Sequence, residues 1–299
     1  MKAPPFQYAD PDGVADTVAL LAELGDEAKV LAGGQSLVPL LNFRLAQPRY
    51  LVDINRVAEL DYIRPLDGGL TLGALVRQRA VERSELVRER CPLLREAIHN
   101  VGHVQIRNRG TVGGSLAHAD PAAELPAVVT ALAAQLRVRG PSGERVLSAG
   151  EFFLGYLTTA LAPDELLVAV ELPAWPVEAG SGFLEFSRHG DFATVGAAAI
   201  LALDDDGRVA RAGLALIGVG GVPFDAATIV DEVLCGERPD EAALRAVGDR
   251  VEAAVQPDSD IRAPADYRKH LANVLTRRAL QRAAERARTD DREQHSHGH

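Results

Sequence analysis

The most constraining feature of this sequence is a glycine-rich segment at residues 107–124. Three glycines lie within five positions, at Gly110, Gly113 and Gly114, and the hydroxyl residues Thr111 and Ser115 lie among them. Glycine reaches positive φ at little cost and allows close approach to its backbone. Successive free N–H groups in such a turn form a nest for an anion. The apolar run 125–136 follows with helical character, so the sequence predicts a loop leading into a helix N-terminus, which suits a phosphate.

A second Gly-Gly turn lies upstream and has the same organisation. Residues 29–32 form a short apolar strand that runs into Gly33 and Gly34, and Ser36 and Leu37 begin a helix. Strand, glycine turn and helix is the context in which such a pair is functional. Alone, this loop would be read as a plain tight turn. Two such loops together suggest a cradle for a diphosphate.

Composition narrows the class of protein. The chain has 299 residues, enough for two domains, and a net charge of −10, which argues against a general nucleic-acid binder. No apolar run approaches the roughly 20 residues needed to span a bilayer. The N-terminus lacks the apolar core of a signal peptide, so we expect a cytoplasmic protein. Cys91 and Cys235 are too few to hold an iron–sulfur cluster with four cysteines of this chain.

Periodicity predicts mixed helices and strands with a break between two domains. We expect helices over 14–24 and 92–99 and hairpins over 63–73 and 136–146. The Pro- and Gly-rich segment 173–182 is typical of a boundary. Beyond it we expect a strand with a turn over 183–191, a long apolar segment over 193–203 and another strand over 209–218. Helices are expected over 224–234, 241–254 and 264–287.

Familiar catalytic motifs are absent from the sequence. It contains no Gly-x-Ser-x-Gly elbow, no metal-ligand pair at helix spacing, no Walker-type phosphate loop and no Gly-x-Gly-x-x-Gly of a Rossmann fold. The two loops therefore carry the function, with hydroxyls from Ser36, Thr111 and Ser115 on a diphosphate. Asp120 and Glu124 suit ribose hydroxyls. That distribution fits a dinucleotide whose redox chemistry comes from the cofactor.

Basic residues flank the second loop. His103, Arg107 and Arg109 could neutralise a cofactor phosphate. For each of them taken singly, a solvated or structural polar residue beside a turn is an equally good interpretation.

Taken together, six motifs resemble the FAD-binding medium subunit of molybdenum hydroxylases, above all the aerobic carbon monoxide dehydrogenase type. The FAD domain of xanthine dehydrogenase is a more distant resemblance. The resemblance covers residues 1–287. The motifs are Ala32-Gly-Gly-Gln-Ser36, Gly102-His-Val-Gln-Ile-Arg-Asn-Arg-Gly110, Thr111-Val-Gly-Gly-Ser115, His118-Ala-Asp-Pro-Ala-Ala-Glu124, Pro163-Asp-Glu-Leu-Leu167 and Ser187-Arg-His-Gly-Asp-Phe-Ala193.

The resemblance implies an α+β fold. An FAD-binding domain of the vanillyl-alcohol-oxidase type would span residues 1–176, in subdomains of about 1–55 and 56–176. A C-terminal α+β domain would span 177–287, and the tail 288–299 would be disordered. The cofactor is FAD, and the implied binding residues are Ala32, Gly33, Gly34, Gln35, Ser36, Leu37, Val101, Thr111, Val112, Gly113, Gly114, Ser115, Asp120, Glu124 and Leu167.

The same resemblance implies electron transfer within a heterotrimer that is itself dimerised. A large molybdopterin subunit would oxidise the substrate, and a small subunit would relay electrons through two [2Fe–2S] clusters. The FAD on this chain would pass them to an external acceptor. A quinone acceptor would bring the complex to a membrane surface.

Two other functions remain open from the sequence. One is a stand-alone flavoenzyme resembling the UDP-N-acetylenolpyruvoylglucosamine reductases, which needs a proton donor in the C-terminal part. Ser187, Arg188 and His189 are the clustered candidates, against the alternative of inter-domain polar contacts. The other is an assembly subunit without cofactor, against which the intact glycines of both loops argue.

Overall fold

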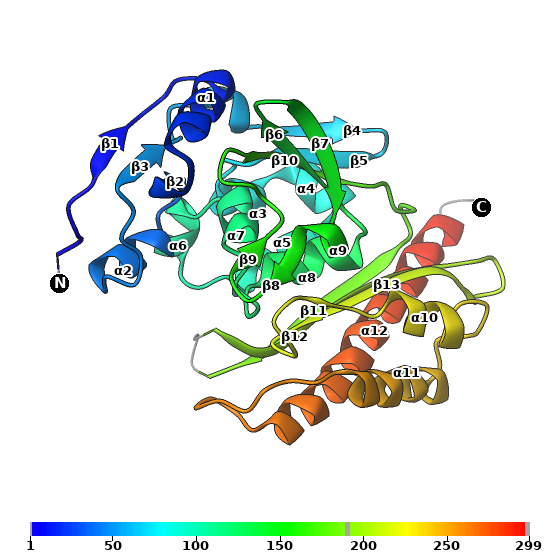
Figure 1. Ribbon diagram of the computed structural model, residues 1–299. Helices are drawn as coiled ribbons and strands as arrows, with labels where there is room; N and C mark the ends of the chain where they lie inside the picture. Colours follow the sequence, from blue (N-terminus) through cyan, green and yellow to red (C-terminus); the bar gives the residue numbers. More distant parts are fainter. Residues whose placement is uncertain (1, 189–191, 297–299) are drawn as a thin grey trace.

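The computed structural model describes residues 2–188 and 192–296, the last part, 288–296, as helical backbone. Figure 1 shows an N-terminal part with two sheets, coloured blue to green, above a C-terminal part whose single sheet lies against long helices, coloured yellow to red. Helices and strands are mixed in both parts, which confirms the α+β class. Among the described residues, no helix combines the length and apolar character needed to cross a bilayer.

The first sheet is small and parallel. Its strand order is β1-β3-β2, and the helices α1 and α2 connect its strands. The predicted strand before the first glycine pair and the predicted helix after it are both present. The elements are β1 (Gln7–Ala9), α1 (Val14–Leu24), β2 (Ala28–Leu31), α2 (Leu37–Asn42) and β3 (Tyr50–Asp53).

The second sheet is antiparallel with the order β4-β5-β10-β6-β7. Both predicted hairpins are present in it. Its strands are β4 (Ile63–Leu66), β5 (Gly69–Gly73), β6 (Gln135–Gly140), β7 (Gly143–Ser148) and β10 (Leu166–Leu172). The connections supply seven helices and a two-stranded sheet, namely α3 (Gln78–Arg83), α4 (Glu85–Arg90), α5 (Pro92–Asn100), α6 (Val104–Arg109), α7 (Val112–His118), α8 (Glu124–Ala131), α9 (Ala149–Phe152), β8 (Phe153–Gly155) and β9 (Thr158–Thr159).

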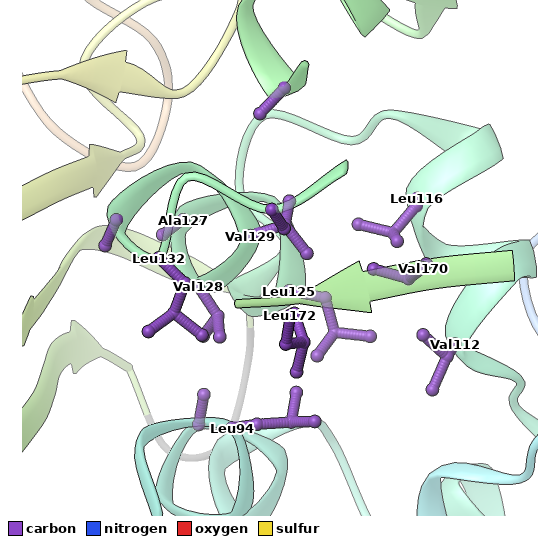
Figure 2. Packing of buried hydrophobic residues seen from close by; sticks show 14 of the residues in the cluster. Leu94, Val112, Leu116, Leu125, Ala127, Val128, Val129, Leu132, Val170 and Leu172 are labelled. Carbon is purple, nitrogen blue, oxygen red and sulfur yellow. The ribbon is translucent and has the colours of Figure 1, made fainter. Parts of the chain in front are cut away.

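The largest hydrophobic core is built around α8. Every residue of α8 is buried, so its side chains meet neighbours on all sides. Figure 2 shows Leu94 of α5 below this helix, and Val112 and Leu116 of α7 beside Val170 of β10. Burial of such side chains stabilises the fold by about 1.5–3 kcal/mol each. The second glycine loop leads into α7, and Val112 and Leu116 anchor this helix in the core.

The C-terminal sheet has the order β11-β12-β13-β14 and is antiparallel. Alternate residues of the apolar strand β12 enter two different cores, for example Ala198 in one and Ala199 in the other. The helices α5 and α8 cover one face, and α12 covers the other. The elements are β11 (Gly180–Ser187), β12 (Ala193–Leu203), β13 (Val209–Ile217), β14 (Phe224–Asp225), α10 (Ala227–Val233), α11 (Glu241–Ala254) and α12 (Ala265–Ser296).

Two helix ends differ from the sequence expectation. The helix predicted over 125–136 ends at Ala131, because Ala133 takes a left-handed φ of 54° and the chain enters β6. The helix α12 continues to Ser296 into the segment expected to be disordered, and no proline or glycine interrupts it before that residue. Residues 297–299 of that segment lie outside the described residues.

We expect Gly213→Ala to destabilise the chain by about 3 kcal/mol, since overpacking of a tight contact costs that much. A Cβ at Gly213 of β13 would lie 2.0 Å from the carbonyl oxygen of Ala131, at the end of α8. Urea unfolding measures the change. The control is Gly155→Ala, where a Cβ meets no atom within 4 Å. Equal stability of the two variants would show that α8 does not pack on this sheet as described.

Candidate functional site

The two glycine loops touch each other. A Cβ at Gly33 would lie 2.5 Å from the carbonyl oxygen of Arg109 and 2.9 Å from Cα of Gly110. A Cβ at Gly114 would lie 3.6 Å from Cβ of Ala32. Segments almost 80 positions apart are thus brought together at the point where the sequence predicts a cradle. Glycine at Gly33 is required by this contact between backbones.

The first loop presents unused amide groups. Gly34 has a left-handed φ of 73°, which turns the chain between β2 and α2. Within the described residues, no group accepts a hydrogen bond from the amides of Gly33, Gly34, Gln35 or Ser36. The Gln35 side chain donates to the Gly33 carbonyl oxygen at 3.2 Å, and Ser36 is the exposed N-cap of α2. Gly33 is buried and Gly34 is half-buried, and N–H groups in such positions are paired with a ligand or an ordered water, whereas solvent reaches the exposed Gln35 and Ser36.

The second loop differs from its prediction. Residues Val112, Gly113 and Gly114 form the first turn of α7, so the helix that begins here is α7 and not the one predicted from residue 125. The amide of Val112 donates to the carbonyl oxygen of Val76 at 3.0 Å, and that of Gly113 donates to Ala74 at 2.9 Å. Close packing requires glycine at Gly113, because a Cβ there would lie 2.5 Å from Cβ of Ala74.

Hydroxyl groups complete this turn. Thr111 is the N-cap of α7, and its Oγ1 accepts from the amide of Gly114 at 3.1 Å. Ser115 is half-buried, and its amide donates to the carbonyl oxygen of Thr111 at 3.2 Å. The predicted nest of free N–H groups is therefore wrong for this loop, since capping and strand-like pairing occupy them. This loop can offer a ligand the hydroxyl of Ser115 and the positive N-terminal end of the α7 dipole.

Arg107 is not available to a phosphate. Its guanidinium is buried, with Nε 3.1 Å from Oε2 of Glu82, and Nη1 donates to the carbonyl oxygens of Val101 and Gly102. Glu82 is also paired with Arg79. Burial opposes ionisation of Glu82, but hydrogen bonds from Arg79 and Arg107 lower the pKa of its carboxyl. Of the two interpretations of Arg107, the structural one is confirmed.

The other basic candidates are exposed. His103 is the N-cap of α6, and Arg109 ends that helix, with its carbonyl oxygen in the contact with Gly33. Arg109 lies close enough to Arg77 to lower the pKa of Arg77, after the larger effect of burial. Asp53 and Asp61 lie near the same two arginines, so the loops are flanked by charges of both signs.

Three carboxyl groups lie near the start of α8. Asp120 caps its own turn, with Oδ1 accepting from the amide of Ala122 at 2.8 Å. Burial raises the pKa of Glu124 to about 8, against a hydrogen bond from its own amide, and the charges of Glu185 and Asp120 add to the increase. Burial likewise raises the pKa of Glu185 to about 7, and its Oε2 has no partner among the described residues. At neutral pH Glu124 is protonated, so it can donate a hydrogen bond as well as accept one.

We expect Glu124→Gln to remove part of the pH dependence of stability. Between pH 4.5 and about 8 the folded chain keeps a proton that the unfolded chain releases, so stability falls as pH rises, by up to about 1.4 kcal/mol per pH unit. The variant should therefore gain stability over the unchanged chain from pH 5.5 to pH 8. Urea unfolding of the ligand-free chain measures this, with the exposed Glu178→Gln as control. Parallel curves for Glu124→Gln and the unchanged chain would contradict a buried neutral carboxyl.

The remaining predicted residues lie around the loops or behind them. Leu37 is the first residue of α2, and Val101 ends α5. Leu167 lies in β10 with its side chain in the largest core. Of the proton-donor candidates, Ser187 ends β11 and Arg188 is exposed, whereas His189 lies outside the described residues.

Sequence reasoning missed two polar residues at the junction of the loops. Arg77 donates to the carbonyl oxygen of Arg109 and to Oδ1 of Asn55, and Asn55 donates to the carbonyl oxygen of Ala32 at 2.8 Å. Neither residue lies in a glycine-rich motif. No local pattern singles them out, because their partners lie more than 20 positions away.

Comparisons with protein families assign both parts of the chain. Residues 4–175 match the FAD binding domain in molybdopterin dehydrogenase. Residues 185–283 match the CO dehydrogenase flavoprotein C-terminal domain.

Individual relatives match over nearly the whole chain. The 6-hydroxypseudooxynicotine dehydrogenase complex subunit alpha of Paenarthrobacter nicotinovorans is 42% identical over 293 residues, covering 96% of this chain and 97% of that one. The carbon monoxide dehydrogenase medium chain of Afipia carboxidovorans is 37% identical over 284 residues, covering 95% and 98%. A solved structure of carbon monoxide dehydrogenase from Hydrogenophaga pseudoflava superposes with a TM-score of 0.93 at 37% identity, covering 96% and 99%.

Proposed function

Because this chain belongs to the family of FAD-binding medium subunits of molybdenum hydroxylases, oxidoreductase complexes of the carbon monoxide dehydrogenase type, we propose that it holds the FAD diphosphate between its two glycine loops. One observation carries this proposal. The loops meet at Gly33, and the amides beside this contact have no acceptor among the described residues. A diphosphate supplies the missing acceptors, and such an anion suits the N-terminus of α2.

The other predicted residues take roles that follow from their positions. The amides of residues 33–36 would bind the diphosphate, and the hydroxyl of Ser115 would add a donor from α7. Arg109 would supply positive charge at the exposed side. Glu124 would exchange hydrogen bonds with ribose hydroxyls in both directions, because burial keeps it protonated. Asp120 would accept from the same sugar, Val101 would line an apolar side, and Leu167 would support that side from within the core.

We propose that the chain works as the electron-output subunit of a heterotrimer, and that two heterotrimers associate. Bound FAD supplies two-electron and one-electron redox chemistry. The protein's task is to hold and orient the cofactor toward both the donor and the acceptor. Cys91 is buried and Cys235 is half-buried, and both are free thiols, so [2Fe–2S] clusters would lie on a small subunit and molybdopterin on a large one.

The setting of the complex follows the same reasoning. Two free thiols suit the reducing cytoplasm. A quinone acceptor would bring the complex to the membrane surface without a spanning helix. Relatives of 42% and 37% identity are named for different substrates, so we propose that the molybdenum subunit selects the substrate.

Co-expression tests this proposal. The chain should co-purify with a large molybdenum-containing subunit and a small iron–sulfur subunit, and its flavin absorption should bleach when the substrate of the complex is added anaerobically. A chain that purifies alone and reduces an enolpyruvyl nucleotide sugar with NADPH would instead be the stand-alone reductase. A chain that gains no flavin absorption with added FAD would contradict both functions.

A further inference from the structure

Arg77 connects the two glycine loops through its side chain. It lies between β5 and α3, as the N-cap of α3. Nη1 donates to the carbonyl oxygen of Arg109, one residue before the second loop. Nη2 donates to Oδ1 of Asn55, whose Nδ2 donates to the carbonyl oxygen of Ala32 at 2.8 Å, at the start of the first loop. One guanidinium thus reaches both loops, directly and through one amide.

Both members of this connection are held in place. The backbone on either side of Arg77 pairs with the second loop, where Gln78 N donates to Gly110 O at 2.9 Å and Val112 N donates to Val76 O at 3.0 Å. Asn55 is fixed by Asp53, whose Oδ1 accepts from the Asn55 amide at 2.9 Å. Tyr8 in turn donates its hydroxyl to Oδ2 of Asp53 at 2.7 Å. Arg77 and Asn55 therefore belong to an ordered hydrogen-bond network.

The charge of Arg77 is not neutralised by an ion pair among the described residues. Its hydrogen-bond acceptors are a backbone carbonyl and an amide oxygen, both neutral. Its charged neighbours are Arg109, which lowers its pKa, and Asp61 and Asp53, which raise it, and the residue is half-buried. Because both donors of Arg77 bond neutral oxygens and no carboxylate of the described residues pairs with it directly, its side chain serves to hold the two loops rather than to form a surface ion pair.

We propose that Arg77, acting through Asn55, is a positioning residue that sets the spacing of the two glycine loops for the diphosphate. This inference rests on the proposed binding of FAD between the loops. Arg77 has committed Nη1 to the carbonyl oxygen of Arg109 and Nη2 to Oδ1 of Asn55, so it shapes the cradle and is not itself a hydrogen-bonding ligand of the phosphates. Planar, two-pronged donation is what the role requires, and lysine cannot provide it.

Binding of FAD and of ADP to the flavin-free full chain tests the proposal, because both ligands carry the diphosphate. Arg77→Met should weaken both by the same factor, about 10- to 100-fold, the effect of losing hydrogen bonds from a charged donor. Asn55→Ala should weaken both by a smaller factor. The control is Arg56→Met, an exposed arginine of the same subdomain that pairs with Asp10 and Asp12, and its affinities should equal those of the unchanged chain.

Arg77→Lys separates positioning from charge. It keeps the cation and loses the two-pronged contact, so we expect most of the loss seen with methionine. Full affinity for both ligands in Arg77→Lys would overturn the proposal, and so would unchanged affinity in both Arg77→Met and Asn55→Ala. A variant that binds FAD more weakly but ADP as tightly as the unchanged chain would also overturn it. Failure of the unchanged chain to bind FAD would instead overturn the proposed function. Thermal unfolding of each flavin-free variant is compared, and Asn55→Ala carries the test if Arg77→Met does not fold.

Discussion

Replacing Gly33 by alanine is expected to yield a folded chain that binds FAD about 100-fold more weakly. The new Cβ would lie 2.5 Å from the carbonyl oxygen of Arg109, where ordinary contact begins at 3.4 Å, and no flexible side chain is present to give way. The loops must move apart by close to an ångström. Strain of this kind costs about 1–3 kcal/mol, and its upper part corresponds to a 100-fold change. Flavin fluorescence quenching during titration with FAD measures the affinity.

The matched control is Gly150→Ala in α9. A Cβ there meets no atom within 4 Å, so alanine should leave FAD affinity unchanged. If Gly33→Ala bound FAD as tightly as Gly150→Ala, contact between the loops would not define the binding site.

Arg107→Ala is expected to lower the free energy of unfolding by about 3 kcal/mol. The change leaves Glu82 buried with Arg79 as its remaining arginine partner, and a buried charge that loses a partner is strongly destabilised. It also removes donors from the carbonyl oxygens of Val101 and Gly102, in a turn where Gly102 has a φ of 42°. Urea unfolding at pH 7 measures the loss.

An exposed pair provides the comparison. Arg245 and Glu241 are paired on α11, but both side chains are more than half exposed, so Arg245→Ala should cost less than about 0.5 kcal/mol. Similar losses in the Arg107 and Arg245 variants would show that Arg107 is not a buried structural residue.

Local patterns predicted the first loop well. A short apolar strand, two glycines and a run of leucines specify β2, the turn at Gly34 and α2, because each step depends on residues next to one another. The buried strand β12 was predicted as an apolar segment for the same reason. Its burial on both faces needed the structure, since α8 and α12 come from distant parts of the chain.

The second loop was harder to predict because its conformation is set by tertiary contacts. Two glycines at the start of a helix run against helix propensity. Burial of Val112 and Leu116 in the core, together with pairing to residues 74–76, stabilises α7 nevertheless. Arg107 and Arg77 have partners 25 and 32 positions away, so no local pattern distinguishes a buried ion pair from a phosphate ligand.

Hydrogen exchange read by mass spectrometry tests the account most directly. In the flavin-free chain, the amides of residues 33–36 should exchange quickly, whereas those of residues 112–115 should already be slow because they are hydrogen-bonded within the protein. Addition of FAD should slow exchange in residues 33–36 and change residues 112–115 little. FAD binding that leaves exchange in residues 33–36 unchanged would contradict a diphosphate held by the first loop.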